Sequence, residues 1–256
     1  MKPLIVANWK MNPQTIDEAK KLFVSVREGI KDIKGAETII CAPFVYLSVL
    51  NQYKGNFLEI GAQDAFWEEK GAYTGEVSPG MLKELGIKYV ILGHSERRRH
   101  LQETDEMINK KIKKSLELGL SPILCVGDMK REAKDDKKEI ALKIEKDLAD
   151  LPRESLNRLI VTYEPIWAIS TTKGGAEATP EDAKEGVVYI RKILSELLGK
   201  DLAGKIKILY GGSADSKNIN NYLCKGEAAG VLVGAASLKS EEFINTVKNS
   251  TKACKT

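Results

Sequence analysis

Four short polar segments of this chain carry residue types that suit acid–base chemistry on a small anionic substrate. Each one follows a short apolar run: Asn8-Trp9-Lys10, Gly93-His94-Ser95-Glu96, Tyr163-Glu164-Pro165 and Tyr210-Gly211-Gly212-Ser213. A carboxylate can carry a proton, an imidazole can polarise a carbonyl, and a lysine can stabilise a phosphate or a developing oxyanion. These segments are therefore the candidates for a catalytic site.

Glu164 is the candidate base. Pro165 disfavours the α conformation for the residue before it, so Glu164 is expected to stay extended at the tip of its strand. His94 is the candidate electrophile, because Ser95 is expected to cap a short helix whose amino end would oppose formation of an imidazolium. The ordinary alternatives are a glutamate paired with a nearby cation and a structural histidine.

Lys10 follows the first apolar run as a compact point charge, which suits a phosphate or an oxyanion. A lysine that only covers the surface is the alternative. Two glycine motifs, Gly211-Gly212-Ser213 and the pair Gly230 and Gly234, would let backbone N–H groups approach an anion. Either glycine motif alone is a weak signal.

The elements that must position these residues alternate along the chain. Eight apolar runs rich in β-forming residues recur about every thirty residues, and segments with helical spacing separate them. The runs are Leu4–Trp9, Thr38–Ala42, Leu58–Gln63, Tyr89–His94, Pro122–Gly127, Leu159–Glu164, Ile206–Tyr210 and Gly230–Val233. Continuous apolar strands are typical of parallel sheets covered by helices, and eight such units close a barrel with its active site at the carboxyl ends of the strands. The fold class predicted is α/β, a (β/α)8 barrel of eight parallel strands in which residues 1–256 form a single domain.

Helix starts and one charged stretch fit this prediction. Thr15 and Thr179 each precede acidic residues and are predicted to cap helices. The charged stretch 130–150 is interpreted as a solvated amphipathic helix, since its apolar residues have helical spacing. Two long connections, 64–77 and 165–178, are predicted to be functional loops.

Composition excludes several function classes. A net charge of +4 among 76 charged residues gives no reason to expect nucleic acid or a membrane as a partner, and the run 97–100 is interpreted as a helix surface or a subunit contact. Two histidines are too few for a multi-histidine zinc site, so no such metal site is expected. Four cysteines without metal spacing are expected to be reduced thiols, and the start of the chain shows no secretion signal. The protein is expected to be cytoplasmic.

The polar segments also resemble a known family. The matching stretches are Ala7-Asn8-Trp9-Lys10-Met11-Asn12, Gly61-Ala62-Gln63, Gly71-Ala72-Tyr73-Thr74-Gly75-Glu76-Val77-Ser78, Gly93-His94-Ser95-Glu96-Arg97-Arg98, Tyr163-Glu164-Pro165-Ile166-Trp167-Ala168, Tyr210-Gly211-Gly212-Ser213 and Leu232-Val233-Gly234. In this order they resemble triosephosphate isomerases from the first strand to the eighth. The resemblance implies a cofactor-free TIM barrel that interconverts glyceraldehyde 3-phosphate and dihydroxyacetone phosphate through an enediolate, in glycolysis and gluconeogenesis.

The resemblance also assigns roles to individual residues. It makes Glu164 the base and His94 the neutral electrophile, and it lets Asn8 and Lys10 hold the oxyanion and the phosphate. Glu96 would belong to the hydrogen-bond network beneath the lysine. Backbone groups would bind the phosphate at four positions, which are Ser170, Ser213, Gly234 and Ala235.

The two long loops have counterparts in the family as well. The first resembles a loop that inserts beside a neighbouring subunit's active site, so a homodimer is implied, with Thr74 at the interface and Glu76 paired with Arg97 across it. The second resembles a lid that excludes water from the intermediate. Here the lid departs from the family, with Ser170 and Thr172 in place of glycines and about three added residues before Thr179. An active enzyme with an altered lid equilibrium is the hypothesis.

Two smaller departures are Ala235, where the family usually has glycine, and Asp64, where it usually has asparagine. Two other functions stay open from the residues alone. A Schiff-base aldolase would need a lysine at a central strand end, whereas the sixth strand offers Glu164. A catalytically silent or moonlighting phosphate-binding barrel is the alternative from another class, and only the altered lid favours it.

Overall fold

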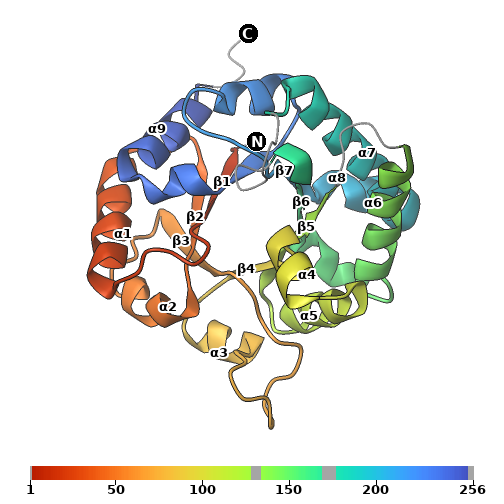
Figure 1. Cartoon of the computed structure of the whole chain (residues 1–256), viewed down its shortest axis with the longest axis horizontal. Coiled ribbons are helices and arrows are strands. Elements are labelled where there is room, and N and C mark those ends of the chain that lie inside the picture. Colours follow the sequence, from red (N-terminus) through yellow and green to blue (C-terminus); the bar gives the residue numbers. More distant parts are fainter. Residues whose placement is uncertain (1, 128–133, 169–176, 253–256) are drawn as a thin grey trace.

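Eight parallel strands form a closed barrel in the computed structural model, which describes residues 2–127, 134–168 and 177–252 (Figure 1). Each strand pairs with its neighbours in chain order, and the first pairs with the last, Leu4 opposite Gly230. The strands are β1 Leu4–Asn8, β2 Glu37–Cys41, β3 Leu58–Ala62, β4 Tyr89–Leu92, β5 Ser121–Val126, β6 Ile160–Tyr163, β7 Lys207–Tyr210 and β8 Gly230–Val233. The predicted (β/α)8 barrel is confirmed.

Helices surround the strands in an outer ring (Figure 1). They are α1 Ile16–Ile30, α2 Phe44–Asn51, α3 Pro79–Glu84, α4 Ser95–Leu101, α5 Asp105–Glu117, α6 Lys134–Asp147, α7 Pro180–Leu198, α8 Lys200–Lys205 and α9 Ser240–Ser250, with short turns η1 Arg153–Arg158, η2 Ile166–Ala168, η3 Asn221–Lys225 and η4 Ala235–Leu238. Thr15 and Thr179 form capping boxes at the starts of α1 and α7, as predicted. Among the described helices, none is long and apolar enough to cross a membrane.

Alternation along the strands divides the core into two layers. Leu4 and Val6 belong to the buried cluster that also takes residues from β2 and β4 to β8, whereas Ile5 and Ala7 pack with the helices. Successive side chains of a strand point to opposite faces, so the first cluster fills the barrel and the second lies between barrel and helices. Asn8 has the parity of Leu4 and Val6, which places its side chain on the inner face at the end of β1.

The expectation of reduced cysteines is partly wrong. Cys41 and Cys125 are free and buried. Cys224 is disulfide-bonded, and Cys254 lies outside the described residues. Sequence spacing does not reveal which cysteines a fold brings together, and this is why the expectation failed.

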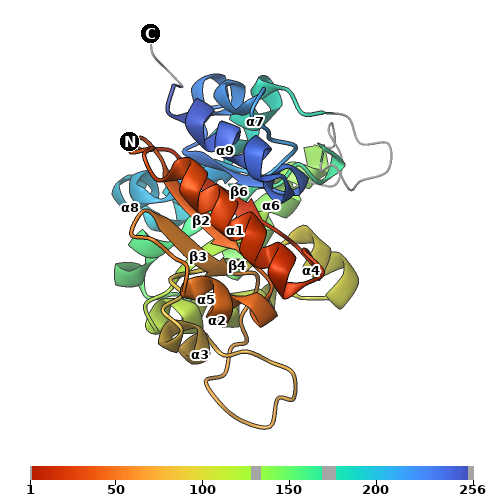
Figure 2. The same cartoon turned by 90° about the vertical axis from the view of Figure 1, so that its left-hand side faces the viewer.

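Six of the eight strands end one or two residues earlier than predicted on the side that carries the polar segments, whereas β7 and β8 end where predicted. For example, β4 ends at Leu92 and β6 ends at Tyr163, so His94 and Glu164 lie in the loops just beyond them. The long connection between β3 and α3 stands out from the ring of helices in both views (Figures 1 and 2). Most of the second long connection, residues 169–176, lies outside the described residues, and with it the predicted lid positions Ser170 and Thr172.

Candidate active site

The carboxyl ends of the strands surround a cavity of about 370 Å³. Seven of the predicted site residues line it, from five of the eight strand ends: Asn8, Lys10, His94, Glu164, Ser213, Gly234 and Ala235. Further lining residues include Glu177, Gly211, Gly212, Asp215 and Asn218. The structure therefore brings together residues that are up to 227 positions apart in the sequence.

Lys10 is held in an unusual backbone conformation at the end of β1. Its φ is +53°, in the left-handed region that a lysine rarely adopts. The Lys10 N–H donates to Asn8 Oδ1 at 3.0 Å, and Gln63 Nε2 donates to the Lys10 carbonyl at 2.9 Å and to the Cys41 carbonyl at 3.0 Å. These bonds compensate the strained conformation and fix the direction in which the side chain leaves the strand.

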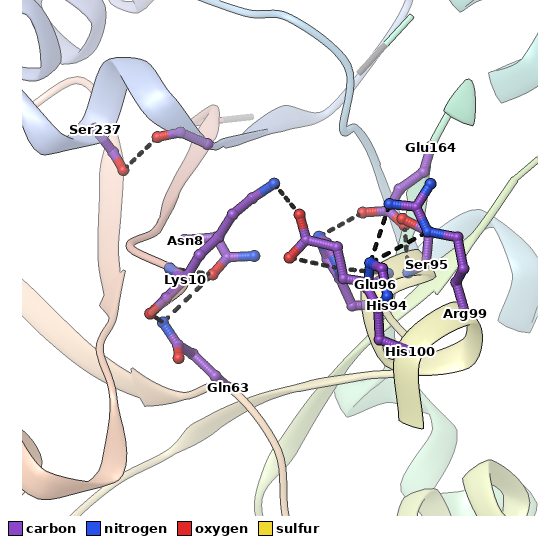
Figure 3. Close-up of polar contacts among 11 residues, drawn as sticks. Asn8, Lys10, Gln63, His94, Ser95, Glu96, Arg99, His100, Glu164 and Ser237 are labelled. Carbon is purple, nitrogen blue, oxygen red and sulfur yellow. Dashed lines mark hydrogen bonds and ion pairs between the residues drawn. The ribbon is translucent and has the colours of Figure 1, made fainter. Parts of the chain in front are cut away.

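The ammonium group of Lys10 pairs with Glu96, with Nζ 2.5 Å from Oε1 (Figure 3). Burial opposes ionisation of Glu96, but the hydrogen bond and charge of Lys10 outweigh it and hold the pKa of Glu96 below its usual value. Glu96 does not line the cavity, so the structure places it behind the lysine. This position agrees with the network that the resemblance implies.

His94 is 6% exposed and caps helix α4. The Glu96 N–H donates to His94 Nδ1 at 3.2 Å, so the predicted cap Ser95 is wrong and the histidine itself accepts the bond. A nitrogen that accepts from a backbone N–H carries no proton, which leaves the ring proton on Nε2. The hydrogen bonding thus favours a neutral imidazole with its donor directed at Glu164.

Glu164 is 2% exposed, and its carboxylate lies against the His94 ring (Figure 3). Oε1 lies 3.1 Å from His94 Nε2, and Oε2 accepts from the Ser95 N–H at 3.1 Å. Its own N–H donates to the Val126 carbonyl at 2.7 Å, which ties the residue to the end of β5. A carboxylate with so little water around it is suited to accept a proton from a bound substrate.

The predicted phosphate corner forms the other side of the cavity. Gly234 and Ala235 lie where β8 passes into η4, and Ser213 follows β7. Ser213 Oγ donates to the Ala168 carbonyl at 3.0 Å, which joins the corner to the residue before the undescribed stretch. Ala235, which stands where the family usually has glycine, also lines the cavity.

The predicted interface residues lie outside the cavity. Thr74 and Glu76 are exposed on the projecting connection between β3 and α3. Arg97 is paired within the chain, with Nη2 2.7 Å from Asp64 Oδ2 and Nε 2.7 Å from Glu103 Oε1. These contacts within the chain do not test the pairing of Arg97 with Glu76 of a neighbouring subunit, which stays a prediction.

A buried ionic cluster behind Arg97 was not predicted. Lys111 Nζ lies 2.9 Å from both oxygens of Asp64 and 2.5 Å from Glu103 Oε1, and all three residues are buried. Burial raises the pKa of Asp64 to about 6, against the opposing charges of Lys111 and Arg97. The departure at Asp64 therefore adds a charge to the root of the projecting connection, and Lys111 and Arg97 compensate that charge.

The run 97–100 was predicted to be a helix surface or a subunit contact, but the side chain of Arg98 turns inward. Its Nε donates to the Gly93 carbonyl at 2.8 Å, and Nη2 donates to Asp147 Oδ2 at 2.7 Å. Since Gly93 precedes His94, this arginine fixes the loop that carries the candidate electrophile. Its position in the sequence gave no signal of this, because the partner Asp147 is 49 residues away.

Comparison with known proteins agrees with this geometry. A sequence model of the family described as Triosephosphate isomerase matches residues 3–250. The chain is 45% identical over 243 residues to a triosephosphate isomerase of Clostridium botulinum (strain Loch Maree / Type A3), covering 94% of this chain and 96% of the relative.

The chain belongs to the triosephosphate isomerase family. It is also 44% identical to the triosephosphate isomerases of Caldanaerobacter subterraneus subsp. tengcongensis and Carboxydothermus hydrogenoformans, over 96% and 97% of this chain and 98% and 99% of the relatives. Membership in the triosephosphate isomerase family confirms the predicted enzyme class and reaction. Nothing in the comparisons favours the alternative of a catalytically silent barrel.

Proposed function

We propose that Glu164 carries the proton between the two substrate carbons while His94 and Lys10 stabilise the oxygen that becomes negative. The observation that carries this proposal is the 3.1 Å approach of Glu164 Oε1 and His94 Nε2 at one side of a cavity that has Lys10 and the glycine-rich turns at the other. A base, an uncharged donor and a cation thus surround a space that suits a small phosphorylated sugar.

The reaction follows from these positions. Glu164 takes a proton from the carbon beside the carbonyl group, and the carbonyl oxygen becomes an enediolate oxygen. The Nε2–H of His94 and the ammonium of Lys10 stabilise that oxygen. His94 Nε2 gives its proton to that oxygen and takes one from the neighbouring hydroxyl, so a proton passes from one oxygen to the other. Glu164, now protonated, returns its own proton to the former carbonyl carbon, which converts aldose into ketose or the reverse with no net change in protons.

Two contacts of Glu164 must change during this cycle. The His94 Nε2–H cannot donate fully to Glu164 and to the substrate oxygen together, so the substrate takes over that bond. The bond from the Ser95 N–H must also lengthen for the carboxylate to reach the substrate carbon. Asn8 and Glu96 then act by positioning Lys10, and Ser170, Ser213, Gly234 and Ala235 by donating to the phosphate.

Replacement of Glu164 tests this assignment. Glu164→Gln and Glu164→Asp should lower kcat by about 10²- to 10⁴-fold, the range typical of a general base, with the circular dichroism spectrum unchanged. Glu196→Gln is the matched control, because Glu196 is exposed near the far end of α7 and only weakly paired, 3.8 Å from Lys192. A kcat of Glu164→Gln close to that of wild type would show that the Glu164 carboxylate is not the base.

The predicted homodimer is part of the same proposal, as is a single functional domain of residues 1–256. The projecting connection exposes Tyr73, and nearby elements expose Met11, Val45 and Met81 at 84%, 73% and 55%. Exposed apolar side chains in such numbers are typical of a surface that a second subunit covers. The family's place in glycolysis and gluconeogenesis supports the expected cytoplasmic location, and triose phosphates remain the small-molecule partners.

A further inference from the structure

Glu177 introduces a negative charge into the substrate cavity, and the reaction above does not use it. The residue precedes helix α7 and lines the cavity together with Lys10, Ser213 and Ala235, which are candidates for holding the phosphate. A carboxylate is an unexpected neighbour for a group that carries up to two negative charges. Its contacts show how it is held there.

The carboxylate is fixed by one side chain of the phosphate corner. Asn218 Nδ2 donates to Glu177 Oε1 at 3.0 Å and to the Ser213 carbonyl at 3.0 Å, while Asn218 Oδ1 accepts from the Asp215 N–H at 2.8 Å. Asn218 therefore connects the carboxylate to the turn that carries Ser213. The amide is uncharged, so this bond orients the carboxylate without neutralising it.

The charge of Glu177 also acts on two buried tyrosines outside the cavity lining. Burial is the main cause that raises the pKa of the Tyr210 and Tyr222 hydroxyls, and the Glu177 carboxylate raises both further. Tyr210 is the last residue of β7, directly before the glycine-rich turn. The field of the carboxylate therefore reaches the strand end from which the phosphate corner is built.

Asp215 is the remaining acidic residue that lines the cavity, and its role is structural. Asp215 Oδ1 accepts from the Lys217 N–H at 2.8 Å and from the Asn218 N–H at 3.0 Å, so it caps the turn after β7. On the cationic side, Lys10 is already paired with Glu96. Among the described residues that line the cavity, Lys10 is the cation, and its pairing leaves little positive charge to offset Glu177.

We propose that Glu177 is a specificity-determining residue that weakens binding of the phosphate group, and that Asn218 orients it for this effect. The proposal rests on the proposed function, in which this corner binds the phosphate. Repulsion between the carboxylate and the phosphate raises the dissociation constants of substrate and product alike. Because the product must leave for the next turnover, weaker binding of the phosphate speeds its release at a cost in KM.

Glu177→Gln isolates the charge, because the glutamine Oε1 can still accept from Asn218. A unit charge facing a phosphate across a cavity of this size changes the affinity by about three- to tenfold at low ionic strength. Titration calorimetry with inorganic phosphate should show the dissociation constant falling by that factor in Glu177→Gln and the gain shrinking as salt is added. Glu196→Gln removes the same charge far from the cavity and should leave the phosphate affinity unchanged.

Steady-state kinetics give a second readout. In Glu177→Gln the KM for glyceraldehyde 3-phosphate should fall about three- to tenfold without a rise in kcat. The ratio of kcat/KM for glyceraldehyde 3-phosphate to that for unphosphorylated glyceraldehyde should rise. Equal changes for the two substrates would place the effect of Glu177 on the carbon chemistry and overturn the proposal.

Unchanged or weaker phosphate binding by Glu177→Gln would also overturn the proposal. Weaker binding would mean that the carboxylate holds the phosphate corner in its binding conformation. The phosphate titration does not depend on catalysis. A wild-type enzyme without isomerase activity would therefore refute the proposed function and still leave this titration decisive for Glu177.

Discussion

Gly127 lies directly against the backbone of Glu164, and replacing it should displace this proposed base. A Cβ at residue 127 would lie 1.7 Å from the Glu164 carbonyl oxygen and 2.6 Å from its carbonyl carbon. Both are backbone atoms and cannot rotate away, so the strand end must move by at least 1.3 Å to reach the 3.0 Å below which such contacts are essentially never seen. A shift of about 1 Å in a catalytic group lowers the rate by roughly 100-fold.

The expected result for Gly127→Ala is therefore a fall of about 100-fold or more in kcat/KM together with a loss of about 1–3 kcal/mol in the free energy of unfolding. The isomerase assay and urea denaturation measure the two effects separately. Gly204→Ala is the control, because a Cβ there meets no heavy atom within 4 Å. Gly204 lies inside helix α8, so this change should leave activity unaltered and add up to about 1 kcal/mol of stability. If the activity of Gly127→Ala stayed within twofold of wild type, the strand end would be shown to shift without moving the Glu164 carboxylate.

Two further predictions concern pH and assembly. Burial raises the pKa of Asp147 to about 7, although the charge of Arg98 opposes this. The folded protein therefore holds this proton more tightly than the unfolded chain does. The resulting stabilisation is complete below about pH 4 and is lost as the pH rises to about 7. Urea unfolding at pH 5, 6, 7 and 8 should therefore show wild type losing stability relative to Asp147→Asn as the pH rises, and a constant difference would contradict the raised pKa. Sedimentation equilibrium should give twice the chain mass of 28.3 kDa, and Glu76→Lys should weaken the dimer at least about tenfold by facing Arg97 with a like charge. A monomer at micromolar concentration, or a dimer indifferent to Glu76→Lys, would refute that interface.

Much of the barrel was predictable because its signals are local. Apolar runs between helical segments indicate buried parallel strands, and hydroxyl caps such as Thr15 and Thr179 form bonds within four residues. The predicted strand ends were less accurate, because polar residues that continue a run do not show where the ladder stops. Gly93, with φ of +70°, turns the chain out of β4 before His94, and the composition of the run does not reveal this turn.

The parts of the site that escaped prediction depend on distant partners. Lys111 and Arg98 are charged residues on helices, and such residues are usually solvated. Their inward positions depend on Asp64 and Asp147, which are 47 and 49 positions away. Gln63 was part of a matched motif, but only the structure shows that it holds the carbonyl of Lys10. A polar residue at a strand end indicates that it forms a hydrogen bond there, but the sequence does not show with which group.

The pairings in the cavity determine where the affinity for substrate arises. Glu164 and His94 satisfy each other, and Lys10 is paired with Glu96, so a substrate gains at the carbon end only bonds that replace existing ones. Such exchanges contribute little net binding energy, because a bond is lost for each bond formed. Most of the binding energy for the substrate should therefore come from the proposed phosphate corner. Glu177 opposes phosphate binding at this same corner. A change of charge at that corner should move KM, whereas changes at Glu164 or His94 should move kcat, and this division separates the residues that hold the substrate from those that transform it.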